Sequence, residues 1–170
     1  MTRMPAMGAI RIIELEPGAG LPPGLLALNN LFAQELSHLS SEKAAHLVRE
    51  AFMACRIGEA DALLLAFDQD AAYENPNFDW FRSRLDRFVY IDRVVVSPAM
   101  RGRGLAQALY RALFRRAAAG GHAQIVCEIN LEPPNPGSDA FHAALGFEQI
   151  GLAILPAAGK TVRYFSRRIV

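Results

Sequence analysis

The feature that most constrains the fold is a strand that passes through a glycine-containing basic turn into a helix. Residues 88–96, with the sequence FVYIDRVVV, form the clearest strand of the chain. The apolar spacing of residues 104–118 predicts a helix. Gly120 ends this helix together with the glycine after it, because glycine tolerates the left-handed conformation at a helix C-terminus. The turn between strand and helix, RGRG at residues 101–104, therefore lies at a helix N-terminus.

The remaining apolar patterns alternate between strand and helix spacing along the chain. Strands are predicted over residues 10–15, 52–57, 62–67, 124–129, 148–155 and 161–169, and helices over residues 25–39, 43–51 and 138–145, with Ser40 as the N-cap of the second helix. Residues 68–86 are polar yet aromatic and have no predicted element. The order β-α-α-β-β-β-α-β-α-β-β predicts an α/β (α+β) domain with one sheet.

Length and composition restrict the class of protein. The 170 residues fit a single domain over residues 1–170, and 52% hydrophobic residues provide a core, which excludes global disorder. The 18 Lys and Arg against 17 Asp and Glu give a net charge of +1, which argues against a nucleic-acid partner. No apolar run is long enough to span a bilayer, so no membrane partner is expected.

The cysteines and histidines give a second restriction. Cys55 and Cys127 are too few for a disulfide framework, which favours a reducing, cytoplasmic location. The four histidines have no metal-ligand spacing with them, so no metal is expected.

The turn at residues 101–104 has the properties of a phosphate site. Helix N-terminal amides attract anions, glycines allow close backbone approach, and Arg101 and Arg103 add charged donors. The alternative is a solvated basic turn. A dinucleotide fingerprint fits less well, because Gln107 occupies the place of its third glycine.

At this point the sequence resembles the GNAT acyltransferase superfamily. The strand 90–96 followed by Arg101-x-x-Gly104-x-Ala106 is similar to the coenzyme A-binding motif of that family. Residues 128–130, then Asn135 and the segment 140–147, resemble the family's second motif. Residues 75–81, 90–93 and 133–138 look most like a little-characterised bacterial subgroup of predicted acetyltransferases. The resemblance implies a mixed, mostly antiparallel sheet of about six or seven strands, splayed at the central strand and flanked by helices.

The resemblance also implies acetyl-CoA as the cofactor and direct acetyl transfer to a primary amine of a small molecule or peptide. The backbone of the strand before the turn would contact the pantetheine arm, and the turn would hold the pyrophosphate. The implied cofactor-binding residues are Val94, Val95, Val96, Arg101, Gly102, Arg103, Gly104, Leu105, Ala106 and Asn135.

Two residues match positions that serve catalysis in the family. Glu128 matches a general base of some branches, and its alternative is a structural hydrogen-bond acceptor. His142 stands where the family usually has a tyrosine whose hydroxyl can protonate the coenzyme sulfur. An imidazole could do the same, or it could bond a backbone carbonyl. Cys127 should face the opposite side of the strand from Glu128, as a small buried hydrophobe.

The acceptor is not identified by these residues, and three classes of function are open. Residues expected near the acceptor are Asn30, Tyr73, Asn77, Phe78, Trp80 and Asp92. The aromatic stretch among them could line a pocket, cover the core or form an interface, and the chain is compatible with a homodimer. The leading hypothesis is an N-acetyltransferase. The alternatives are a non-catalytic coenzyme A-binding sensor or interaction module, and a structural domain with a degenerate turn.

Overall fold

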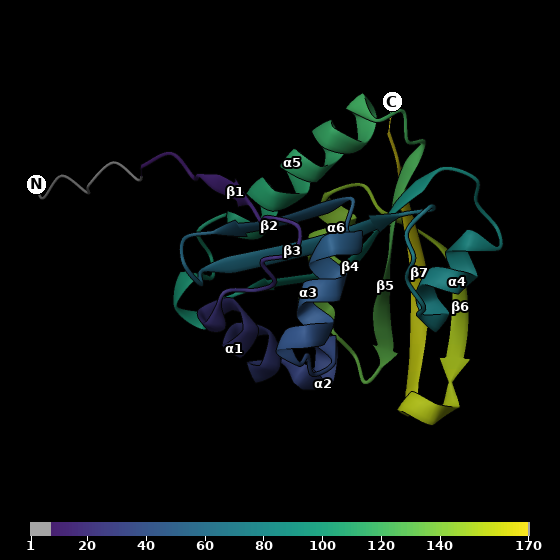
Figure 1. Ribbon diagram of the computed structural model, residues 1–170. Helices are drawn as coiled ribbons and strands as arrows, with labels where there is room; N and C mark the ends of the chain where they lie inside the picture. Colours follow the sequence, from purple (N-terminus) through teal and green to yellow (C-terminus); the bar gives the residue numbers. More distant parts are fainter. Residues whose placement is uncertain (1–7, 170) are drawn as a thin grey trace, which may run out of the picture.

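A computed structural model of the chain describes residues 8–169, which form one mixed seven-stranded sheet in the order β1-β2-β3-β4-β5-β7-β6 (Figure 1). Its strands are β1 (Ile12–Glu14), β2 (Met53–Ile57), β3 (Ala62–Asp68), β4 (Phe88–Val96), β5 (Gln124–Glu132), β6 (Glu148–Leu155) and β7 (Lys160–Arg168). Every neighbouring pair is antiparallel except β4 and β5. The predicted fold class, a mostly antiparallel α/β sheet with helices, is confirmed.

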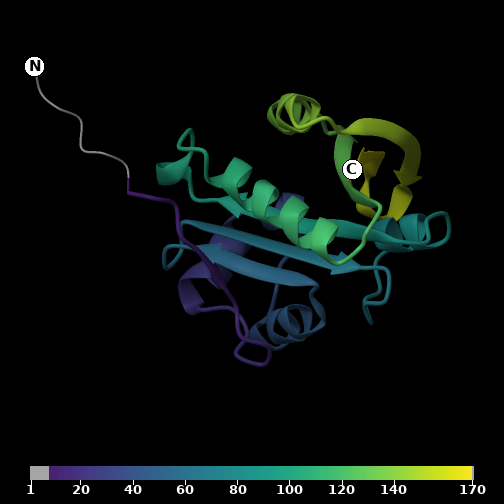
Figure 2. The ribbon, with the colours of Figure 1, turned by 90° about the horizontal axis from the view of Figure 1, so that it is seen from above.

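Helices cover both faces of the sheet. They are α1 (Pro23–Leu31), α2 (Ala33–Leu36), α3 (Ser41–Glu50), α4 (Pro76–Arg82), α5 (Leu105–Ala119) and α6 (Pro136–Ala144), and short 3-10 turns span Pro98–Met100 and Pro156–Ala158. In Figure 2, α5 and α6 lie on one side of the sheet and α1, α2 and α3 on the other. Two buried clusters correspond to these faces, one around Leu47 and Phe78 and one around Leu109 and Leu113.

The central strands β4 and β5 separate after a short parallel pairing. Their register runs only from Phe88 opposite Gln124 to Tyr90 opposite Val126. Beyond this point β5 diverges from β4 in Figure 1, so the edge of β4 from Ile91 onward has no ladder partner on that side. The splay predicted at the central strand is therefore present, and it opens the middle of the sheet.

A bulge on β4 lies at the start of the splay. Leu65 pairs with Arg93, whereas Ala66 pairs with Ile91, so Asp92 is an extra residue on β4. A bulge re-aims the side chains of the strand that carries it. Here it leaves Asp92 at the cavity described below.

Three predicted elements differ from the observed ones. The single helix expected over residues 25–39 is two helices, α1 and α2, because the backbone leaves the helical conformation at Phe32. The stretch 68–86, expected to have no element, contains α4, whose N-cap is Asn75. The strand expected to end at residue 129 continues to Glu132. By contrast, Ser40 caps α3 as predicted, and its hydroxyl accepts a hydrogen bond from the Lys43 amide at 3.1 Å.

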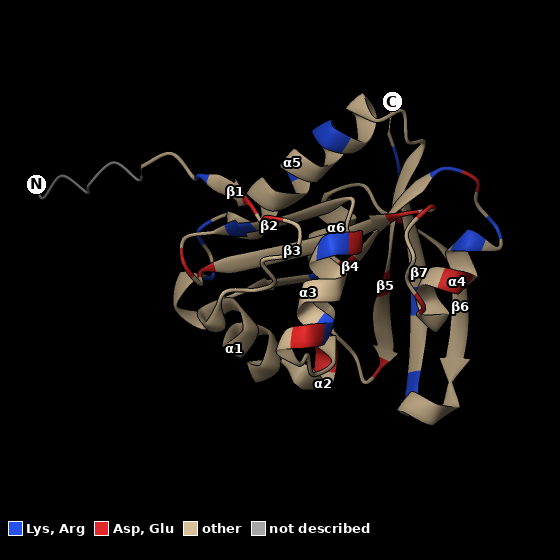
Figure 3. Cartoon of the chain, in the orientation of Figure 1, with Lys and Arg blue, Asp and Glu red and all other residues tan. Residues whose placement is uncertain are grey.

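Three further properties of residues 8–169 bear on function. No helix among them is long and apolar enough to cross a membrane. They contain no group of three or more His, Cys, Asp or Glu side chains suited to hold a metal ion. In the view of Figure 3, basic and acidic residues are interspersed over the helices and strands.

Candidate active site

The N-terminus of α5 provides an open set of backbone amides. Gly104, its N-cap, has a left-handed backbone (φ 77°) and no side chain caps the first turn. Gly102 is also left-handed (φ 75°), and a Cβ at either glycine would meet no atom within 4 Å. The N-terminal amides of a 15-residue helix attract anions, and the space around these glycines is open.

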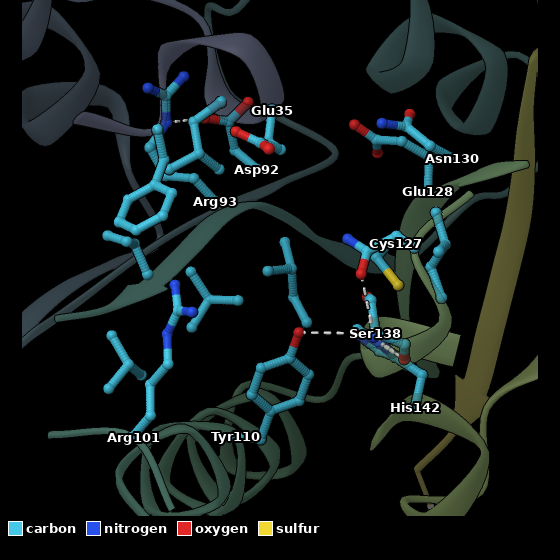
Figure 4. Close-up of a pocket in the computed structure, with 18 residues that line it drawn as sticks. Glu35, Asp92, Arg93, Arg101, Tyr110, Cys127, Glu128, Asn130, Ser138 and His142 are labelled. Carbon is cyan, nitrogen blue, oxygen red and sulfur yellow. Dashed lines mark hydrogen bonds and ion pairs between the residues drawn. The ribbon is translucent and has the colours of Figure 1, made fainter. Parts of the chain in front are cut away.

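A cavity of about 460 Å³ leads from this loop into the splay between β4 and β5 (Figure 4). We call it the central cavity. Its walls come from α2, β4, α5, β5 and α6, together with Phe32 and Arg101. The lining includes Glu35, Asp92, Val94, Val95, Val96, Arg101, Tyr110, Cys127, Glu128, Asn135, Ser138 and His142. The central cavity thus extends from Arg101, in the loop before α5, to Glu128 on β5.

Glu128, on β5, is a buried titratable group of the central cavity. Its Oε1 accepts hydrogen bonds from the Tyr90 hydroxyl at 2.9 Å and from Asn77 Nδ2 at 3.1 Å. Its Oε2 is buried and has no hydrogen-bond partner among the described residues. Burial raises the pKa of the Glu128 carboxyl from 4.5 to about 7, against the opposing effect of the Tyr90 hydrogen bond. The group therefore changes charge near neutral pH, as a general base requires.

Helix α4, on the face of the sheet opposite α5, holds the Glu128 side chain in place. Asn77, in its first turn, donates to Glu128 and accepts a hydrogen bond from the Tyr164 hydroxyl at 2.8 Å. The Trp80 ring stacks on Tyr164 with ring centroids 4.2 Å apart. The amide of Asn77 is thereby held in one orientation, with its nitrogen toward the carboxylate.

Asp92, at the bulge, belongs to a second buried network. Its carboxylate accepts hydrogen bonds from the Tyr73 hydroxyl and, at 2.6 Å, from Arg93 Nε. The Arg93 guanidinium also donates to Asn29 on α1 at 2.9 Å. The charge of Asp92 is thus compensated within the protein, and the network ties α1 to the bulge of β4.

His142, on α6, lies on the opposite wall from Asp92 in Figure 4. Its Nδ1 is 2.8 Å from the Ser138 carbonyl oxygen, and its Nε2 is 2.8 Å from the Tyr110 hydroxyl on α5. Burial lowers the pKa of the imidazole below 6.5. Of the two interpretations of His142, the bond to a backbone carbonyl is observed. The sequence motifs do not include Tyr110, whose signal is a phenol among the aliphatic residues on the buried face of α5.

The other predicted site residues fall into three groups: one that lines the central cavity, two at the start of α5, and five that do not line the cavity. Asn135 lines the central cavity, and its side chain caps α6 by accepting a bond from the Ser138 amide at 3.2 Å. Leu105 turns its side chain into the core, so only its amide can face a ligand, while Arg103 is exposed. The third group does not line the central cavity: Asn30, which bonds the Leu39 backbone, together with Tyr73, Asn77, Phe78 and Trp80.

Cys127 lies beside Glu128 on β5, with its thiol on the other face of the sheet, as predicted. It packs in the cluster around Leu109, and burial raises the pKa of its thiol well above 9. Cys55 is likewise buried as a free thiol. A thiol that stays protonated is a poor nucleophile, so Cys127 is not suited to carry an acyl group.

The splayed sheet, the open N-terminus of α5 and the buried carboxyl at the splay are the arrangement that the sequence resemblance implies for an acyltransferase. The sequence profile of the acetyltransferase (GNAT) family matches residues 44–147. The chain belongs to this family of acetyltransferases, which use acetyl-CoA. No curated protein sequence matches the chain significantly.

Solved structures share the fold at low sequence identity. Naa20 of Chaetomium thermophilum, in complex with a bisubstrate analogue, has a TM-score of 0.71 at 14% identity, covering 94% of this chain and 87% of that one. A GNAT-family acetyltransferase from Streptococcus pneumoniae has a TM-score of 0.69 at 14% identity, with coverages of 95% and 99%. An aminoglycoside 6'-N-acetyltransferase complexed with coenzyme A has a TM-score of 0.68 at 12% identity, with coverages of 95% and 98%.

Proposed function

We propose that this protein transfers the acetyl group of acetyl-CoA directly to a primary amine of a small molecule or peptide. The observation that carries the proposal is the position of Glu128, a buried carboxyl with a pKa of about 7 in the same cavity that Arg101, from the loop before α5, also lines. Family membership supports the reaction class.

The cofactor end of the site fits coenzyme A. The amides of residues 103–106 would hold its pyrophosphate, with Arg101 at the mouth of the central cavity. The edge of β4 at Val94, Val95 and Val96 has no ladder partner toward β5, so its backbone groups are available to a pantetheine arm. The bound group supplies an activated thioester, and the protein orients it along β4.

The amine end of the site requires a base, and Glu128 is placed to act as one. A protonated amine cannot attack a carbonyl carbon, so a group near neutral pKa must first accept its proton. Glu128 Oε2 is free to do so, directly or through one water, while Oε1 is held by Tyr90 and Asn77. Glu35, also at the cavity, adds a negative charge that favours a cationic acceptor.

Thermal unfolding with added coenzyme A or acetyl-CoA tests the cofactor part of this proposal. Either ligand should raise the melting temperature of the wild-type protein by mass action. Gly104→Glu should abolish the increase, because it places a carboxylate where the phosphates bind. Gly159→Glu is the matched control, because Gly159 is also left-handed with open space around it but lies in the turn between β6 and β7.

An amine panel with acetyl-CoA, followed by mass spectrometry of the products, tests the transfer and identifies the acceptor. Acetylated product from one class of amine supports an enzyme. Stabilisation by coenzyme A without any acetylated product would instead indicate a non-catalytic binding module. Absence of stabilisation by either ligand would overturn the proposal.

A further inference from the structure

The central cavity contains a phenol and imidazole pair that the base chemistry of Glu128 does not use. The Tyr110 hydroxyl of α5 and His142 Nε2 of α6 are 2.8 Å apart, and both residues line the cavity (Figure 4). Tyr110 lies about one and a half turns into α5. A thioester anchored at the α5 N-terminus and directed toward Glu128 would pass this hydroxyl.

The proton positions in this pair follow from the neighbours of His142. Two oxygens of Ser138 lie near Nδ1, the carbonyl oxygen at 2.8 Å and the hydroxyl oxygen at 3.2 Å. The nearer one, the carbonyl oxygen, can only accept a hydrogen bond, so we assign the proton to Nδ1, and the hydroxyl can accept from it as well. Burial disfavours the imidazolium, so Nε2 keeps its lone pair and accepts the bond from Tyr110. Burial also raises the pKa of the Tyr110 phenol well above 10, so the hydroxyl keeps its proton at neutral pH.

The surrounding titratable groups do not reverse this arrangement. Cys127 and Glu128 on β5 both raise the pKa of the Tyr110 hydroxyl further. Asp139 on α6 raises the pKa of His142, but burial is the larger effect on the imidazole. His142 therefore offers a lone pair rather than a proton at Nε2, and Tyr110 is the proton donor of the pair.

We propose that Tyr110 is a catalytic residue that protonates the departing sulfur, and that His142 is a positioning residue that holds the Tyr110 hydroxyl. The inference rests on the proposed function. It moves the proton donor from α6, where the sequence suggested His142, to α5.

Glu128 takes one proton from the ammonium, and the amine nitrogen forms a bond to the carbonyl carbon. As the carbon–sulfur bond breaks, the sulfur keeps the electron pair and Tyr110 gives it the phenol proton. The second nitrogen proton leaves to water, and Tyr110 regains a proton from water. Glu128 then releases its proton, so amide, thiol and one net proton are the products.

Titration of bound coenzyme A tests the role of Tyr110 without an acceptor. Ultraviolet absorbance of the thiolate gives the thiol pKa of coenzyme A bound to each variant. A hydroxyl that donates to the sulfur stabilises the thiolate, so Tyr110→Phe should raise that pKa by about one unit, a tenfold change in acidity. Tyr164→Phe removes a buried hydroxyl from the Glu128 side and should leave the thiol pKa unchanged.

Kinetics with the best acceptor of the amine panel give the second readout. Tyr110→Phe should lower kcat at least about tenfold while the KM for acetyl-CoA stays within about twofold, because the ring still packs. His142→Phe should lower kcat as well. His142→Gln should recover part of it, because an amide oxygen can accept the bond from Tyr110.

The pH profile separates Tyr110 from His142 as the acid. If Tyr110 donates the proton, wild-type kcat does not fall between pH 7 and about 9. A fall through the titration of an imidazole, or full activity of Tyr110→Phe with an unchanged thiol pKa, would overturn the inference. A wild-type protein that binds no coenzyme A would instead overturn the proposed function, so the two failures are distinguishable.

Discussion

Two helices, α4 behind Glu128 and α6 in the wall of the central cavity, start alike but hold groups that behave differently. Helix α4 begins with Asn75-Pro76 and helix α6 with Asn135-Pro136, and in both the asparagine caps the first turn. Each helix also takes part in a hydrogen-bonded group that includes a tyrosine. On α4, Asn77 donates to Glu128, which also accepts a bond from Tyr90. On α6, His142 is bonded to the Tyr110 hydroxyl.

Burial acts on these two groups in opposite directions. It raises the pKa of the Glu128 carboxyl to about 7 and lowers that of the His142 imidazole. The directions are opposite because burial disfavours the charged form of each group, which is the deprotonated carboxylate in one case and the protonated imidazolium in the other. The carboxyl is thereby brought into the range of a general base, and the imidazole becomes a fixed acceptor. The same physical effect thus gives a proton acceptor on one side and an oriented hydroxyl on the other.

The largest expected effect is the loss of turnover when the carboxyl of Glu128 is replaced. Glu128→Gln keeps the shape of the side chain and its contacts with Asn77 and Tyr90, but removes the base. We expect kcat to fall at least about 100-fold, measured as release of free thiol from acetyl-CoA with the best amine. Glu132→Gln, an exposed change on the same strand, is the control. Unchanged turnover in Glu128→Gln would exclude the carboxyl as the base.

A second prediction concerns stability and needs no acceptor. Because the pKa of Glu128 is 4.5 in its reference state and about 7 in the fold, the folded protein binds this proton more tightly and loses stability as pH rises through this range. Relative to Glu128→Gln, the wild type should lose about 3 kcal/mol of unfolding free energy between about pH 4 and pH 8. Chemical denaturation at several pH values measures the difference. Parallel curves would contradict the raised pKa.

The smallest effect is expected at the two caps. Asn75→Ala removes the oxygen that accepts from the Asn77 and Phe78 amides at 2.8 and 3.3 Å, and should cost about 1 kcal/mol of unfolding free energy. Asn135→Ala, its counterpart at α6, should cost a similar amount. The two sides should differ in activity: only Asn75→Ala should shift the pH at which kcat rises, because only α4 contacts Glu128. Equal shifts in both variants would contradict this.

The sequence predicted those parts of the fold that depend on local pattern. The bounds of β4 agree with the prediction because its β-branched and aromatic residues, interrupted only by Asp92 and Arg93, end just before Ser97-Pro98. The sequence did not predict the break between α1 and α2, because the apolar spacing continues across Phe32. The segment after α2 is held by hydrogen bonds between the Asn30 side chain and the Leu39 backbone, nine residues away, which the spacing does not show. Helix α4 was not predicted because seven residues are too few to give a clear periodic pattern, although Asn75-Pro76 is an ordinary helix start.

The candidate site divides in the same way. Glu128 and the turn at Arg101 were identified because motif spacing along the chain is local information. Tyr110 was not, because a phenol on a buried helix face has the same pattern as a core residue. Its role depends on α6 reaching α5, a contact between residues 32 positions apart. Tertiary neighbours of this kind are not encoded in periodicity.

The stacking of Trp80 on Tyr164 gives the protein an optical signal of its own. Trp80 is the only tryptophan in the chain, and Tyr164 leads through Asn77 to Glu128. We therefore expect the emission of this single indole to change with the charge and packing around Glu128. Tryptophan fluorescence should then follow the ionisation of Glu128 without any label.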